Sequence, residues 1–128
     1  MTTPLTEGQY PSEFILSEAP GRLSHDTVTV TVAAATTLRP GMVLGKLTAT
    51  GKYVPYDNAG SDGSETAAGI LYGELVNAAV SPADKTGVVV NLNAEVRKAD
   101  LQWASGLVDA DKTAAYVDLR TLGIKARD

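Results

Sequence analysis

Thr and Val alternate from Thr27 to Val32, and this alternation is the clearest pattern along the chain. In an extended chain it places Val28, Val30 and Val32 on one face. Both residue types are β-branched, which suits a pleated surface with one buried side. The stretch therefore predicts a β-strand.

Shorter apolar stretches, punctuated by glycine and proline, predict further strands at residues 42–48, 53–56, 66–76 and 87–96. We expect a turn at Pro40-Gly41, another at Gly51, and breaks or bulges at Gly69 and Gly73. Pro55 places the second of these strands at an edge or an end of a sheet. Residues 77–86 are rich in small and polar types and predict a loop.

The pattern becomes helical in the C-terminal third. Residues 97–107 predict a short helix closed by Gly106, and a longer helix follows. The residues that carry the longer helix are Ala115, Leu119 and Leu122 on one face, Asp109 or Asp111 as the N-terminal cap, and Gly123 as the C-terminal cap. Several short strands followed by one or two helices predict a mainly β domain of α+β type.

Length and composition narrow the class of protein. A chain of 128 residues with 44% hydrophobic residues fits one domain with its own core. The net charge of −4 argues against a DNA- or RNA-binding protein. The absence of cysteine excludes disulfides, thiol catalysis and zinc–cysteine sites. No apolar run approaches the length of a membrane span, and the N-terminal residues lack the pattern of a signal peptide.

Two glycine-rich stretches need a test for ligand binding. "GMVLGK" (residues 41–46) has three residues where a phosphate-binding P-loop has four, and Leu47 stands where that loop needs Ser or Thr. "DNAGSDGSE" (residues 57–65) does not place oxygen ligands at the positions of a calcium loop in either possible frame. We therefore expect a strand with a bulge in the first case and a solvated hairpin tip in the second, with no metal or cofactor.

His25 is the only histidine and stands between Ser24 and Asp26. Consecutive residues of an extended chain point in alternating directions, so this triplet cannot form a catalytic relay by itself. An enzyme using His25 is the alternative, and a polar turn before the Thr/Val strand is the favoured interpretation. No catalytic residue is predicted.

Residues 1–18 predict an N-terminal arm distinct from a β-rich domain at residues 19–128. The first twelve residues are polar and interrupted by Pro4, Gly8 and Pro11. The apolar run Phe14-Ile15-Leu16 follows, and these three residues are the candidates for contact with a partner. An extended peptide can add a strand to an exposed sheet edge of another protein, and several arms on one oligomer would bind with avidity.

Four stretches resemble the lambda-type bacteriophage head decoration proteins: "EFILSEAPGRLSHDTVTV", "LRPGMVLGKLTATGKYVPYD", "GSETAAGILYGEL" and "AAYVDLRTLGIKARD". The resemblance covers nearly the whole chain in the expected order. It implies a small β-tulip domain that forms a homotrimer and binds the major capsid protein on the outer surface of the expanded head, at local three-fold positions. It also implies stabilisation against internal DNA pressure, assembly in the host bacterial cytoplasm, and no contact with nucleic acid or membrane. The alternative is a small β-clip-like module that binds carbohydrate or peptide.

Overall fold

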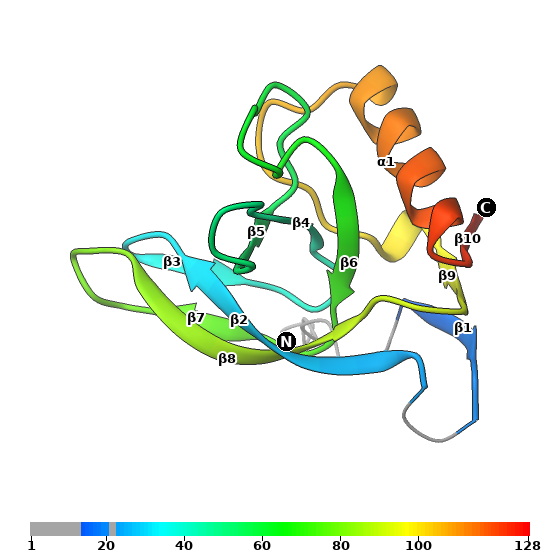
Figure 1. Cartoon of the computed structure of the whole chain (residues 1–128), viewed down its shortest axis with the longest axis horizontal. Helices are drawn as coiled ribbons and strands as arrows, with labels where there is room; N and C mark the ends of the chain where they lie inside the picture. The colour runs from blue at the N-terminus through cyan, green and yellow to red at the C-terminus, as the bar shows by residue number, and fades with distance from the viewer. Residues whose placement is uncertain (1–13, 21–22) are drawn as a thin grey trace, which may run out of the picture.

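Two long strands, β2 and β8, form an extended ribbon along one side of the molecule (Figure 1). The computed structural model describes residues 14–20 and 23–128. The elements are β1 (Ile15–Glu18), β2 (His25–Val32), β3 (Thr36–Leu38), β4 (Val43–Lys46), β5 (Tyr53–Pro55), β6 (Ala67–Leu71), β7 (Leu75–Asn77), β8 (Ala83–Val90), β9 (Ala94–Arg97), the 3-10 helix η1 (Lys98–Asp100), α1 (Asp109–Thr121) and β10 (Ile124–Arg127). The expected mainly β class is confirmed.

The strands of the described residues form three sheets. β2, β5, β4, β6 and β8 close into a small barrel. β3 and β7 form an antiparallel pair beside it. The third sheet has the order β1-β9-β10, in which β1 runs antiparallel and β10 parallel to β9. Helix α1 lies between β9 and β10 in the chain and packs against β10 and β6 (Figure 1). Parallel neighbours need such a crossover connection.

The buried apolar residues in the described part of the chain fall into two clusters. One fills the barrel and contains Val30, Val32, Leu38, Leu44, Tyr53, Leu71 and Val89. The other lies between the barrel, α1 and the three-stranded sheet, and contains Phe14, Val43, Tyr56, Ala67, Ile70, Val90, Ala94, Val96, Leu101, Ala115, Leu119 and Ile124. The second cluster ties β1 to the rest of the domain, because Phe14 belongs to it.

The predicted strand at residues 27–32 is confirmed within β2, and the predicted long helix is confirmed as α1. The single strand predicted at residues 87–96 is wrong. The chain leaves β8 after Val90 and resumes as β9 at Ala94, because Asn93 adopts a left-handed conformation with φ of 42°. The predicted loop at 77–86 is also too long, since β8 begins at Ala83.

The helix predicted at residues 97–107 is wrong except for the single turn of η1. The chain after η1 pairs with the segment that leads into β4 of the barrel instead. The Gln102 N–H donates to the Gly41 carbonyl at 2.9 Å, and the Val43 N–H donates to the Gln102 carbonyl at 3.1 Å. These bonds hold the backbone extended, so tertiary pairing overrides the local helical pattern. Strands β1, β3 and β10 were not predicted as strands of this domain.

Candidate interaction surface around β1

Strand β1 lies at the edge of the three-stranded sheet. Ile15 is opposite Val96 and Glu18 is opposite Ala94, and the register shifts between Ile15 and Ser17. The Arg97 N–H also donates to the carbonyl of Phe14 at 2.8 Å. Among the described residues β1 pairs with β9 alone. Its other edge therefore presents backbone groups that a strand from a partner can bind.

The three predicted contact residues are adjacent but differ in exposure. Phe14 is 1% exposed and packs in the domain's own core. Ile15 is partly buried against the same cluster. Leu16, at the register shift, is 42% exposed. Of the three, only Leu16 has an exposed apolar side chain to offer a partner, whereas Phe14 holds β1 in place. Residues 1–13 of the predicted arm lie outside the described residues.

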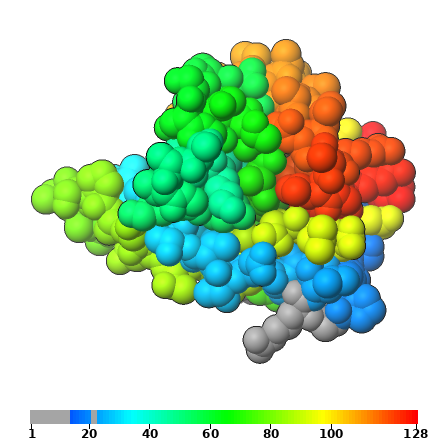
Figure 2. Space-filling model, in the orientation of Figure 1, coloured from blue at the N-terminus to red at the C-terminus, as the bar shows by residue number. Residues whose placement is uncertain are grey.

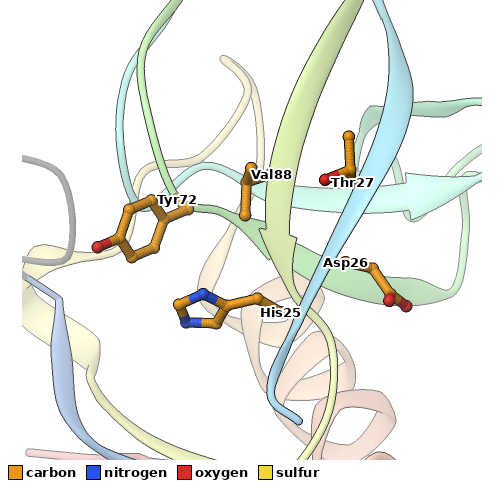
Figure 3. Close-up of a pocket in the computed structure, with 5 residues that line it drawn as sticks. All are labelled: His25, Asp26, Thr27, Tyr72 and Val88. Carbon is orange, nitrogen blue, oxygen red and sulfur yellow. The ribbon is translucent and has the colours of Figure 1, made fainter. Parts of the chain in front are cut away.

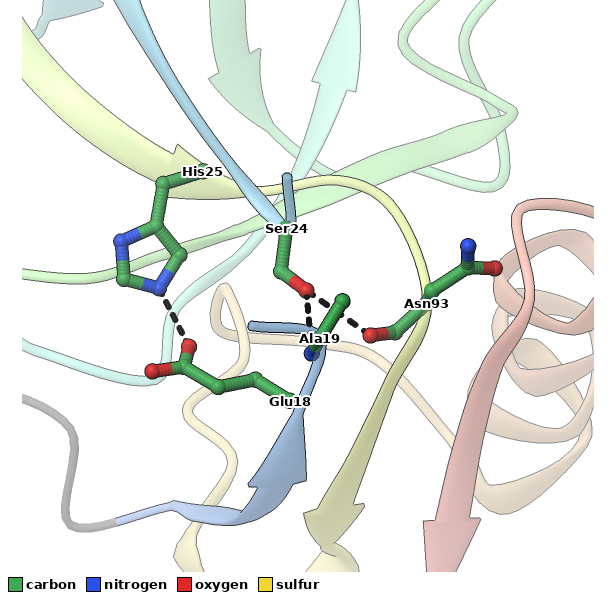
Figure 4. A network of polar contacts seen from close by, with 5 residues as sticks. All are labelled: Glu18, Ala19, Ser24, His25 and Asn93. Atoms are coloured by element: carbon green, nitrogen blue, oxygen red, sulfur yellow. Dashed lines mark hydrogen bonds and ion pairs between the residues drawn. The ribbon is translucent and has the colours of Figure 1, made fainter. Parts of the chain in front are cut away.

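His25, the first residue of β2, closes one end of this surface. Its Nε2 atom contacts the carboxylate of Glu18 at the end of β1 (Figure 4). Its ring lies 4.9 Å from the ring of Tyr72, centre to centre, with the planes at 49°. His25, Tyr72 and Val88 line a shallow pocket of about 320 Å³ (Figure 3). The single histidine thus links β1, β2 and the segment after β6.

Ser24 fixes the chain at the same place. Its hydroxyl accepts a hydrogen bond from the Ala19 N–H at 2.9 Å and donates one to the Asn93 carbonyl at 2.8 Å (Figure 4). Asp26 points away from the His25 ring (Figure 3) and accepts a hydrogen bond from Asn91 at 2.8 Å. Ser24, His25 and Asp26 therefore have separate partners. Their arrangement serves the junction of strands, where the sequence predicted a polar turn.

The outer face of the three-stranded sheet carries charge. Arg127 of β10 donates a hydrogen bond to the Glu95 carboxylate of β9 at 2.9 Å. This bond and the positive charge hold the pKa of Glu95 below its ordinary value, and hydrogen bonding from Ser17 of β1 adds to the effect. The surface around Leu16 is therefore a small apolar spot beside paired charges.

The polar segment 57–65 is more than the solvated tip that the sequence predicted. Asn58 donates to the Asp111 carboxylate of α1 at 2.9 Å, and the Tyr56 hydroxyl donates to the Asp111 carbonyl at 3.1 Å. Burial, and then the nearby Asp118, Asp111 and Asp57, raise the pKa of Tyr56 above its ordinary value. The segment therefore docks on α1.

Within this segment the carboxylates bind their own loop. Asp62 accepts hydrogen bonds from the Ser64 hydroxyl at 2.6 Å and from the Ser64 N–H at 3.2 Å, and these bonds lower the pKa of Asp62. Over the described part of the chain, no three His, Asp or Glu side chains gather in a way that could hold a metal ion. A Cβ added to Gly45 would lie 2.7 Å from the Ser64 backbone, so this glycine of "GMVLGK" allows the loop to pack on β4.

The chain matches the family of the bacteriophage lambda head decoration protein D over residues 4–124. The chain belongs to this family. Membership makes it a protein of the phage capsid, where head decoration proteins bind. No curated protein matches the chain. Across residues 14–20 and 23–128, no helix has the length and hydrophobicity to cross a membrane.

Two contacts in this decoration protein were not predicted from the sequence. The contact between Glu18 and His25 joins residues seven apart, and the bond from Ser24 to Asn93 joins residues 69 apart. The Asn-Leu-Asn triplet at residues 91–93 was the available signal for a turn beside Ser24, because Asn tolerates positive φ. Nothing in the local sequence shows which residue this turn contacts.

Proposed function

We propose that this decoration protein binds the outer surface of the expanded head as a homotrimer at local three-fold positions. It contacts the major capsid protein there and stabilises the shell against internal DNA pressure. The observation that carries the proposal is the family match over residues 4–124. The net charge of −4 is consistent with a position outside the packaged DNA. Family membership favours this function over a carbohydrate- or peptide-binding module.

We further propose that β1 and the residues before it form the capsid contact. The edge of β1 that no described strand occupies can pair with a strand of the major capsid protein, and Leu16 adds an apolar contact. Phe14 and Ile15 contribute by holding β1 on β9, since Phe14 is buried in this chain. The proposed arm then works as an extension of the domain's own sheet.

The trimer matters for the strength of this contact. Each backbone hydrogen bond in an added strand contributes only about 1 kcal/mol net. One copy would therefore bind weakly after the ordering of its contact segment. Three linked copies bind with avidity, because the second and third contacts form at a high effective concentration. A trimer on a three-fold position matches three such contacts to three equivalent capsid sites.

A deletion of residues 2–12 tests the contact. It removes the segment before β1 and keeps Phe14, whose loss would damage the core. We expect the shortened protein to retain the thermal stability of the full chain and to lose sedimentation with expanded capsids. Leu16→Ala in the full chain should weaken capsid binding, and Val117→Ala, at a 64% exposed site on α1, is the matched control. Undiminished capsid binding by the shortened protein would refute the arm contact.

A further inference from the structure

One end of the molecule projects beyond the barrel. It consists of the β2–β3 connection at residues 33–35 and the β7–β8 connection at residues 78–82, and we call it the projecting end (Figures 1 and 2). Residues 32–38 and 75–83 include no Asp, Glu, Lys or Arg, although charged residues make up 20% of the chain. Depletion of charge is typical of the centre of a protein interface.

The projecting end is also apolar and exposed. Val80 is 98% exposed and Val76 on β7 is 51% exposed. Ala33, Ala35, Ala78, Ala79 and Pro82 around Val80 are exposed as well. An isolated exposed valine is ordinary on a protein surface, but a charge-free group of this kind at a protruding tip indicates a contact surface.

Asn77 holds the projecting end in one conformation. This side chain is 2% exposed, and its amide donates hydrogen bonds to the carbonyls of Val32, Ala33 and Ser81 at 3.0 to 3.1 Å. Its oxygen accepts a bond from the Ala79 N–H at 3.0 Å. Four bonds from one buried side chain fix both connections, so docking would order little further backbone.

A groove lies on the same chain, and one of its lining residues, Glu74, is charged. Residues 72–75 and 86–88 line a pocket of about 210 Å³, which adjoins the His25 pocket through the shared residues Tyr72 and Val88. Gly73 in this groove has an ordinary φ, and a Cβ added to it would meet nothing within 4 Å. Every other glycine that the structure describes has either a positive φ or a neighbour within 4 Å. Nothing among the residues that the structure describes therefore requires glycine at position 73, which is consistent with close approach by another molecule.

The projecting end cannot enter the groove of its own chain. Both belong to the β7–β8 unit, and β8 separates Ala83 at the projecting end from Gly87 in the groove by about 13 Å at 3.3 Å per residue. A second copy carries the same two features and can use them in turn. The whole chain has a net charge of −4, so contact through the charge-free end also limits repulsion between copies.

We propose that the projecting end of one copy inserts into the groove of the next copy, with Val80 facing Gly73. A contact between two different surfaces of one chain repeats head to tail and closes into a ring where its rotation allows. The inference rests on the proposed homotrimer and assigns its contact surfaces. A ring of three uses each projecting end and each groove once.

Val80→Asp and Gly73→Leu test the two halves of this contact. Both positions have room among the described residues of a single copy, so both variants should keep the thermal midpoint of the wild type. Each should weaken trimer formation at least about tenfold, as measured by analytical ultracentrifugation, because each disrupts the centre of the contact. Val117→Asp, at an exposed site on α1, is the matched control and should remain trimeric.

Cross-linking gives an independent readout, because the natural chain has no cysteine. The double variant Gly73→Cys with Val80→Cys, treated with a short bismaleimide both free and on capsids, should give covalent trimers. Val80→Cys alone should give no covalent dimer. Capsid decoration without cross-linked trimers, or a trimeric Val80→Asp variant, would overturn this inference and leave the proposed function standing. A wild type that fails to bind capsids would overturn the proposed function itself.

Discussion

Phe14→Ala tests whether β1 belongs to the folded domain. Phe14 is 1% exposed and packs in the cluster that joins α1 to the three-stranded sheet. Removing a buried phenyl ring costs about 3–5 kcal/mol, through lost burial and the cavity left behind. A domain of this size loses about 3 °C in thermal midpoint per kcal/mol, so we expect a fall of about 10–15 °C.

Urea unfolding followed by tryptophan fluorescence measures this change directly. Trp103 is the only tryptophan, and it packs against the same cluster as Phe14. Leu16→Ala is the control on the same strand: Leu16 is 42% exposed, so its truncation should cost no more than about 1 kcal/mol. A Phe14→Ala variant within about 0.5 kcal/mol of the wild type would show that β1 does not pack as described.

Two further predictions concern the loop beside β4 and one surface ion pair. Gly63→Ala should lower the thermal midpoint, because φ is 111° there and the new Cβ would lie 2.2 Å from the Lys46 carbonyl oxygen. Gly73→Ala is the control and should be nearly neutral. Equal thermal midpoints for the two variants would contradict the described loop packing. The hydrogen bond from Lys52 lowers the pKa of Asp84 in the folded state. The ionised Asp84 therefore stabilises the fold fully above about pH 4, and this stabilisation declines as the pH falls further and the carboxylate takes up a proton. Lys52→Met should therefore flatten the loss of stability below about pH 4 in denaturant titrations, and superimposable wild-type and variant profiles would refute this role.

The sequence predicted the elements whose pattern is set by burial on one face. Thr and Val alternate in β2, where Val30 and Val32 are buried, and the helical spacing of Ala115 and Leu119 places both in the core. Elements defined by distant partners were missed. β10 does alternate, with Ile124 buried and Lys125 exposed, but four residues after a helix carry too little signal.

The candidate surface was predicted only as a segment. Phe14, Ile15 and Leu16 form one apolar run in the sequence, and the register shift in β1 lies between Ile15 and Ser17, at Leu16. Pairing with β9 comes from residues about 80 positions away, so the run alone cannot show that Phe14 is buried and Leu16 is exposed. The bonds of Ser24 and Glu18 are equally invisible in the sequence, because they depend on how the strands meet.

Electron microscopy of expanded phage heads mixed with the purified protein tests the central claim most directly. We expect three-lobed density on the outer surface at the local three-fold positions, joined to the major capsid protein near β1. Heads that stay undecorated at saturating protein, or density confined to other positions, would contradict it.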